Sequence, residues 1–166
     1  MKFEKHGHIF QLTAVLQVSA DLDTAWNFLS NPMNLKRITP EYMGFHVISG
    51  VEEEMYAGQI ISYKVSPLFG VNLNWVTEIT HVRPKEFFVD EQRKGPYALW
   101  HHKHFLKPIE NGTEMKDVVH YQLPLPLISN HLHSIVVQPR LREIFNYRTE
   151  VLKEIFGTFK GPQSNK

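Results

Sequence analysis

The sequence predicts an α+β domain in which a long C-terminal helix covers the concave face of a curved, seven-stranded antiparallel sheet. Three observations support this fold class. After residue 44 the hydrophobic period changes from helical to alternating, the alternating runs are joined by short turns, and residues 141–156 form an amphipathic helical pattern. Short connections favour antiparallel neighbours because parallel strands need long crossovers. Helices gathered on one side of such a sheet are typical of the α+β class.

The first expected elements are one strand and two short helices. Residues 9–18 alternate loosely without Gly or Pro, which indicates a strand. Asp21 is a suitable N-cap for a helix that carries apolar residues at helical spacing. Asn31 and Pro32 are typical of a second helix start, and Pro40 ends that helix.

Six further alternating runs follow, each bounded by residues that favour turns, such as 67–70 and Arg83-Pro84. Asn111-Gly112 between two strand-like runs is typical of a hairpin turn. The six expected strands are 45–49, 59–65, 73–82, 87–93, 99–106 and 114–123.

The final expected element is a helix with a stripe of Leu, Ile and Phe from Leu141 to Phe156. Pro139 either occupies the first turn of this helix or kinks it. A helix of ~18 residues spans ~27 Å, which matches strands of about eight to ten residues. It is therefore long enough to lie across the sheet.

Length and composition exclude several classes of protein. A chain of 166 residues fits a single domain, 1–166, with an ordered core of about 8–157 and a tail at 158–166. The 18 Lys and Arg nearly balance the 17 Asp and Glu, so we expect no nucleic-acid partner. Without Cys there is no thiol chemistry, disulfide or Fe–S cluster. With no signal peptide and no apolar run near ~20 residues, we expect a cytoplasmic protein without a membrane span.

Aromatic, acidic and histidine residues recur in a pattern along three segments near the middle of the chain. The segments are Phe88-Val89-Asp90-Glu91-Gln92, Gly95-Pro96-Tyr97 and Trp100-His101-His102-Lys103-His104-Phe105. With Asn34-Leu35-Lys36-Arg37-Ile38-Thr39-Pro40 and Leu141-Arg142-Glu143-Ile144-Phe145-Asn146-Tyr147-Arg148, this pattern resembles a bacterial subgroup of the SRPBCC (START/Bet v 1-like) superfamily. That subgroup is related to polyketide cyclase/dehydrase and lipid transport proteins.

The resemblance covers about residues 8–157 and implies the helix-grip fold, with a ligand cavity between the sheet and the terminal helix. The chain departs from the family pattern at 125–139, where relatives usually have a Gly-containing approach to the helix. Members of the superfamily bind lipids, sterols, polyketides or plant hormones, and some catalyse cyclisation or hydration. The resemblance implies the fold strongly and the function weakly, because one fold hosts many activities.

Strand alternation assigns side chains to faces without reference to the family. In the run 99–106, His102 and His104 share a face with Trp100, and His101 lies on the opposite face. The face that carries Trp100 is the more apolar one, on this run and on the neighbouring strands. We therefore expect it to be the concave interior, although it also carries polar residues. Its expected members are Phe88, Asp90, Gln92, Met115, Asp117, Val119 and Tyr121.

Five polar residues are expected on this inner face: Asp90, Gln92, His102, His104 and Asp117. Burying their side chains would be costly unless they are hydrogen-bonded. They form either a structural network, a polar patch that orients a ligand, or a catalytic site with a His–Asp general base. The candidate catalytic residues are His102, His104 and Asp117. The candidate ligand-binding residues are Trp75, Phe88, Asp90, Gln92, Trp100, His102, His104, Asp117 and Tyr121.

Other functional signals in the sequence are weak. His102 and His104 with one carboxylate could form a 2-His-1-carboxylate metal set, but His-x-His alone is a weak signal, so we expect no metal and no cofactor. We expect the pairs His6/His8 and His131/His133 to face solvent. Arg148 either lies at the cavity mouth as an anion anchor or, as we expect, pairs on the surface with neighbours such as Glu150.

The sequence as a whole favours a protein that binds a hydrophobic small molecule, lipid- or polyketide-like with a polar head. The first alternative is an enzyme of cyclase, dehydratase or hydrolase type that uses the His–Asp pair. The sequence has no nucleophile elbow, phosphate loop or HExxH motif, but enzymes of this fold share no universal motif, so this absence does not decide between binding and catalysis. The second alternative is a regulatory protein that acts through protein contacts.

Overall fold

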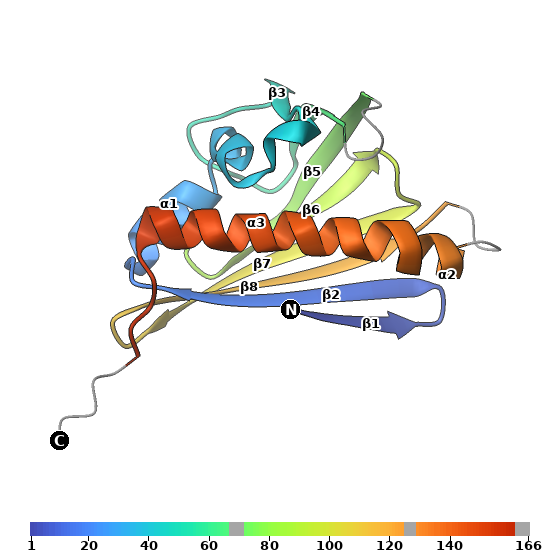
Figure 1. Cartoon of the computed structure of the whole chain (residues 1–166). Coiled ribbons are helices and arrows are strands. Elements are labelled where there is room, and N and C mark those ends of the chain that lie inside the picture. The colour runs from blue at the N-terminus through green and yellow to red at the C-terminus, as the bar shows by residue number, and fades with distance from the viewer. Residues whose placement is uncertain (67–71, 125–128, 162–166) are drawn as a thin grey trace.

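The computed structural model describes residues 1–66, 72–124 and 129–161. It contains one antiparallel sheet with the strand order β1-β2-β8-β7-β6-β5-β4-β3, and helix α3 lies across one face of it (Figure 1). The strands are β1 Lys2–His6, β2 Ile9–Val18, β3 His46–Ser49, β4 Gln59–Val65, β5 Leu73–Arg83, β6 Phe87–Lys94, β7 Leu99–Ile109 and β8 Gly112–Gln122. The helical segments are α1 Leu22–Leu29, η1 Pro32–Ile38, η2 Glu41–Met43, α2 Ser129–Leu132, η3 His133–Val137 and α3 Gln138–Phe156.

The α+β class and the covering C-terminal helix are confirmed, but the sheet has eight strands and not seven. The additional strand is β1, which pairs with β2 in a register that places Phe3 opposite Leu12. Three of its five residues are charged and only Phe3 is apolar, so it lacks the apolar alternation that predicts a strand. Charged residues are common on edge strands because they discourage pairing with another chain. The turn expected at 67–70 lies outside the described residues.

Helix α1 is confirmed with its expected cap, because the Asp21 carboxylate accepts a hydrogen bond from the Thr24 backbone N–H at 2.8 Å. The second expected helix is a 3-10 helix, η1, and not an α-helix. Asn31 caps it as expected, accepting from the Met33 N–H at 3.0 Å. Seven residues between Pro32 and Pro40 leave little length for α-helical hydrogen bonds, and tighter 3-10 turns are common in such short connectors.

The C-terminal helical segments run without interruption from residue 129 to residue 156. Pro139 occupies the first turn of α3, which is one of the two expected alternatives. Immediately before it, η3 is π-helical, and the Gln138 N–H donates to the His133 carbonyl five residues earlier. The wider π turn lets the helix continue past a proline that would otherwise clash with the preceding turn.

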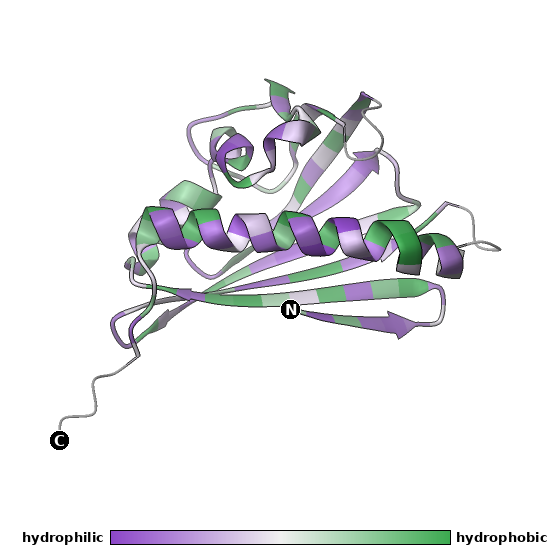
Figure 2. Cartoon of the chain, in the orientation of Figure 1, coloured by the Kyte–Doolittle hydropathy of each residue, from purple (hydrophilic) through white to green (hydrophobic). Residues whose placement is uncertain are grey.

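Helix α3 is amphipathic, as its alternating apolar and polar segments show in Figure 2. Leu141, Phe145 and Leu152 are almost completely buried against the sheet. Each such side chain contributes about 1.5–3 kcal/mol by leaving water. None of the helices within the three described stretches is long and apolar enough to cross a membrane.

Candidate functional site: a small cavity with a histidine–carboxylate network

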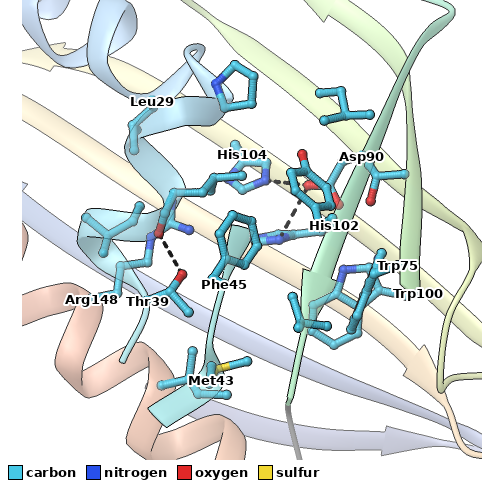
Figure 3. A pocket seen from close by; sticks show the side chains of 18 of the residues that line it. Leu29, Thr39, Met43, Phe45, Trp75, Asp90, Trp100, His102, His104 and Arg148 are labelled. Atoms are coloured by element: carbon cyan, nitrogen blue, oxygen red, sulfur yellow. Dashed lines mark hydrogen bonds and ion pairs between the residues drawn. The ribbon is translucent and has the colours of Figure 1, made fainter. Parts of the chain in front are cut away.

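A cavity of about 190 Å³ lies between the sheet, η1 and α3, and is partly open to solvent (Figure 3). This volume is below the roughly 300–1,000 Å³ of sites for drug-sized ligands. It is somewhat larger than an engineered cavity of about 150 Å³ that binds benzene in another protein. The cavity therefore has room for about one ring system, and not for a long acyl chain.

Most of the cavity wall is apolar. Alternate residues of β4 point into it, namely Ile61, Tyr63 and Val65. Trp75 of β5 and Trp100 of β7 meet edge to face, with ring centroids 5.4 Å apart and planes at 88°. Further apolar lining comes from α1, η1, η2 and the residue that precedes β3, from the segment between β3 and β4, and from α3. It includes Leu29, Leu35, Ile38, Met43, Phe45, Met55, Leu141, Ile144 and Phe145.

The polar end of the cavity is built by three neighbouring strands. In the register of β6 and β7, Asp90 lies opposite His102, and in that of β7 and β8, His104 lies opposite Asp117. Residues paired across antiparallel strands project to the same face, so all four side chains meet. The His102 and His104 side chains are only 8% and 6% exposed.

Each histidine is placed between the same two carboxylates. Toward the sheet, Asp117 Oδ1 lies 3.0 Å from His102 Nε2 and 2.9 Å from His104 Nδ1, although the latter pair lacks hydrogen-bond geometry. Toward the cavity, Asp90 Oδ2 lies 2.7 Å from His104 Nε2 and 3.6 Å from His102 Nδ1. Asp117 thus orients the His102 ring by a hydrogen bond and lies beside that of His104, and Asp90 faces the nitrogens on their other side.

Arg148 of α3 completes this network, and the expectation that it lies on the surface is wrong. Its side chain is 11% exposed and its Nη2 lies 3.5 Å from Asp117 Oδ1, whereas Glu150 pairs with Lys153. Arg148 also lines the cavity, and its Nε has no hydrogen-bond partner in the described part of the chain. It occupies the inward helical series of Leu141, Phe145 and Leu152, a spacing that identifies its face from the sequence.

The pKa values in this network are shifted by burial and by charge together. Burial alone would raise the pKa of Asp90 and Asp117, but the histidines and Arg148 outweigh it, and both pKa values are lowered. Burial, reinforced by the charge of His104, lowers the pKa of His102. Burial would also lower the pKa of His104, but Asp117 and Asp90 outweigh it and raise that pKa. Of the two histidines, His104 is therefore the one that holds a proton more tightly.

Two kinds of chemistry are open to this arrangement. A neutral imidazole oriented by a carboxylate can act as a general base toward a molecule in the cavity. One ligand atom each of Asp90, His102 and His104 also lies within 4.8 Å of the others, a spacing that could hold a metal ion.

Six of the nine predicted ligand-binding residues line the cavity: Trp75, Phe88, Asp90, Trp100, His102 and His104. The other three, Gln92, Asp117 and Tyr121, do not line it. The Gln92 side chain holds the turn before β7, donating to Tyr97 O at 2.7 Å and accepting from Tyr97 N–H at 3.3 Å. Asp117 lies behind the histidines. Alternation predicts the face of each residue but not how close it lies to the space under α3.

Tyr121 instead contacts a histidine that we expected in solvent. His133 is 7% exposed, its ring stacks on Phe10 with centroids 3.7 Å apart, and its Nε2 lies 2.7 Å from the Tyr121 hydroxyl. Burial lowers the pKa of His133, so a neutral imidazole shares this hydrogen bond with the tyrosine hydroxyl. The expectation of exposure is wrong for His133 and confirmed for His6, His8 and His131.

Three comparisons place the chain among known proteins. A family model described as "Polyketide cyclase / dehydrase and lipid transport" matches residues 18–143. A search of curated proteins finds no significant match.

Among solved structures, a solution structure of a protein from Arthrobacter aurescens has a TM-score of 0.67 at 16% identity, covering 99% of this chain and 98% of that one. A START superfamily protein from Mycobacterium smegmatis has a TM-score of 0.65 at 11% identity, covering 88% and 96%. The major latex-like protein 151 of Panax ginseng has a TM-score of 0.63 at 9% identity, covering 90% and 99%.

At these identities the structural matches establish the fold alone, which is Bet v 1-like as the sequence predicts. The family model spans well over half of the chain, including the strands that carry the histidine–carboxylate network. The chain belongs to the polyketide cyclase/dehydrase and lipid transport family.

Proposed function

We propose that this protein binds a small, mostly apolar molecule with one polar group in the cavity between the sheet and α3. The observation that carries the proposal is a cavity of about 190 Å³ whose walls are apolar and aromatic except at one end. Sites for small molecules commonly combine an apolar lining with a few convergent polar groups. Membership of a family that includes lipid transport proteins is consistent with such a role.

The cavity volume narrows the expected ligand. Lipid- and polyketide-like molecules are larger than one ring system, so only a segment of such a molecule fits within about 190 Å³. The preferred ligand is therefore a compact molecule of about one ring, or a larger one whose remainder projects through the open side. Its polar group would lie at Asp90 and His102, and its ring against Trp75 and Trp100.

A matched pair of variants on one strand tests this proposal. Ile61 of β4 lines the cavity, whereas its neighbour Ile60 is 47% exposed on the other face. Binding of a panel of monocyclic phenols and ketones is measured by tryptophan fluorescence and by NMR. We expect Ile61→Trp to fill the cavity and weaken binding by at least about tenfold, and Ile60→Trp to leave it unchanged. Equal effects, or no binding to the unmodified protein, would contradict the proposal.

One observation favours catalysis as a second candidate function. His102 is held by Asp117 through Nε2, its Nδ1 faces the cavity, and burial lowers its pKa so that it is a free base near neutral pH. For a molecule that binds and is converted, His102→Ala would abolish turnover while affinity is largely kept. Loss of affinity and turnover in parallel would assign His102 to binding alone.

A further inference from the structure

We propose that Asp90, His102 and His104 bind one divalent transition-metal ion of the Zn²⁺ or Fe²⁺ type at the polar end of the cavity. This site goes beyond the proposed function, because the ion would bind whether or not an apolar molecule occupies the rest of the space. The remaining coordination positions would take water or an oxygen atom of a molecule in the cavity. Figure 3 shows the three side chains turned toward one another.

The spacing of the donor atoms supports a shared ion. Ligand atoms at about 2.0–2.2 Å from one ion lie roughly 3.0–3.5 Å from each other in tetrahedral or octahedral geometry. Asp90 Oδ2 lies 3.6 Å from His102 Nδ1 and 2.7 Å from His104 Nε2. The first distance has to close slightly and the second to open by a few tenths of an ångström. The donor atoms of the three residues lie within 4.8 Å of one another, and the side chains have to rotate to share one ion.

Asp117 supplies the outer partner that metal-binding histidines usually have. Such histidines almost always donate their second ring N–H to a carboxylate or carbonyl, which fixes the tautomer and the direction of the ring. Asp117 Oδ1 is hydrogen-bonded to His102 Nε2 at 3.0 Å, and it lies 2.9 Å from His104 Nδ1 without hydrogen-bond geometry. This buried carboxylate thereby fixes the His102 ring with its other nitrogen on the side of Asp90, and it lies beside the second nitrogen of His104.

The charge balance also calls for a cation. With neutral imidazoles, the carboxylates of Asp90 and Asp117 face the single guanidinium of Arg148, which leaves one negative charge in a buried place. An uncompensated buried charge is costly. Either a proton on the network or a metal ion restores the balance.

The site is open on the side where a metal ion needs a free position. Asp90, His102 and His104 all line the cavity, whereas Asp117 lies behind them. A 2-His-1-carboxylate set with free positions is typical of non-haem Fe²⁺ sites, and two histidines with a carboxylate also bind catalytic Zn²⁺. A bound ion would polarise a carbonyl or lower the pKa of a bound water.

The test uses untagged full-length protein treated with EDTA and then titrated with ZnCl₂ by calorimetry. We expect one Zn²⁺ per chain, and binding at least about tenfold weaker in Asp90→Asn and His102→Gln. The matched control is His101→Gln, which alters the neighbouring histidine on the opposite face of β7 and is expected to leave affinity unchanged. Circular dichroism verifies the fold of each variant.

X-ray absorption of the unmodified protein loaded with Zn²⁺ keeps the proposal testable if the variants fail to fold. We expect two imidazole nitrogens and at least one oxygen at about 2.0–2.2 Å. No stoichiometric binding, a spectrum without imidazole, or equal losses in His101→Gln and His102→Gln would overturn the site. Zn²⁺ binding to a protein that binds none of the phenols and ketones would uphold the metal site and refute the proposed function.

Discussion

Asp117→Asn tests whether the buried network holds the sheet and α3 together. The carboxylate oxygen Oδ1 is shared by His102 and His104 at 3.0 and 2.9 Å and by Arg148 at 3.5 Å. A hydrogen bond to a charged group contributes about 1.5–3 kcal/mol, and breaking a buried ion pair costs about 3–5 kcal/mol. We therefore expect the free energy of unfolding to fall by about 3 kcal/mol. For a chain of this length, that lowers the midpoint of thermal unfolding by about 6–12 °C.

The assay is urea unfolding at pH 7 in EDTA, followed by tryptophan fluorescence, with the slope m expected to stay constant. Glu150→Gln is the control, because its ion pair with Lys153 on the same helix is exposed and contributes less than about 1 kcal/mol. Combining Asp117→Asn with Arg148→Met should cost less than the sum of the single changes, since the two residues interact. An Asp117→Asn variant as stable as Glu150→Gln would refute this account of the network.

Three further outcomes are expected. His133 is neutral in the fold, with its pKa below the unfolded value of about 6.5, so stability should fall as pH drops through 6.5 by at most about 1.4 kcal/mol per pH unit. His133→Phe should reduce this slope in urea titrations without abolishing it, because burial also lowers the pKa of His102, and an unchanged slope would contradict the prediction. Gly112→Ala should lose about 1–3 kcal/mol, because its Cβ would lie 2.0 Å from Val18 O, while Gly161→Ala stays neutral in the same assay. Phe145→Ala should lose about 3–5 kcal/mol but shift the binding preference toward larger ring systems, and an unchanged preference would place the ligand elsewhere.

Much of the fold follows from local signals in the sequence. Asp21 before an amphipathic run specifies the start of α1, and Asn111, with a positive φ of 64°, forms the tight turn between β7 and β8. Strand alternation correctly places His102 and His104 on the inner face. Strand β1 was missed because an edge strand is held by backbone pairing and needs no apolar pattern.

The details of the site depend on tertiary structure that periodicity does not specify. Helical spacing places Arg148 on the inner face of α3, but its partner Asp117 lies on β8, and only the tertiary structure brings the two together. His133 is buried only because the π turn of η3 brings it over Phe10 and Tyr121. Gln92 shares a face with Asp90 but is taken up by the turn at Tyr97. In each case the partner is remote in sequence or lies in an irregular segment.

The central claim is that the cavity under α3 holds a small molecule at its histidine–carboxylate end. The most direct measurement is a crystal structure of the protein purified from the organism that makes it, without added ligands. We expect electron density for a compact molecule that contacts His102 at its polar end and Trp100 at its apolar end. A cavity closed by rearranged side chains of α3, with no space beside His102, would contradict the claim.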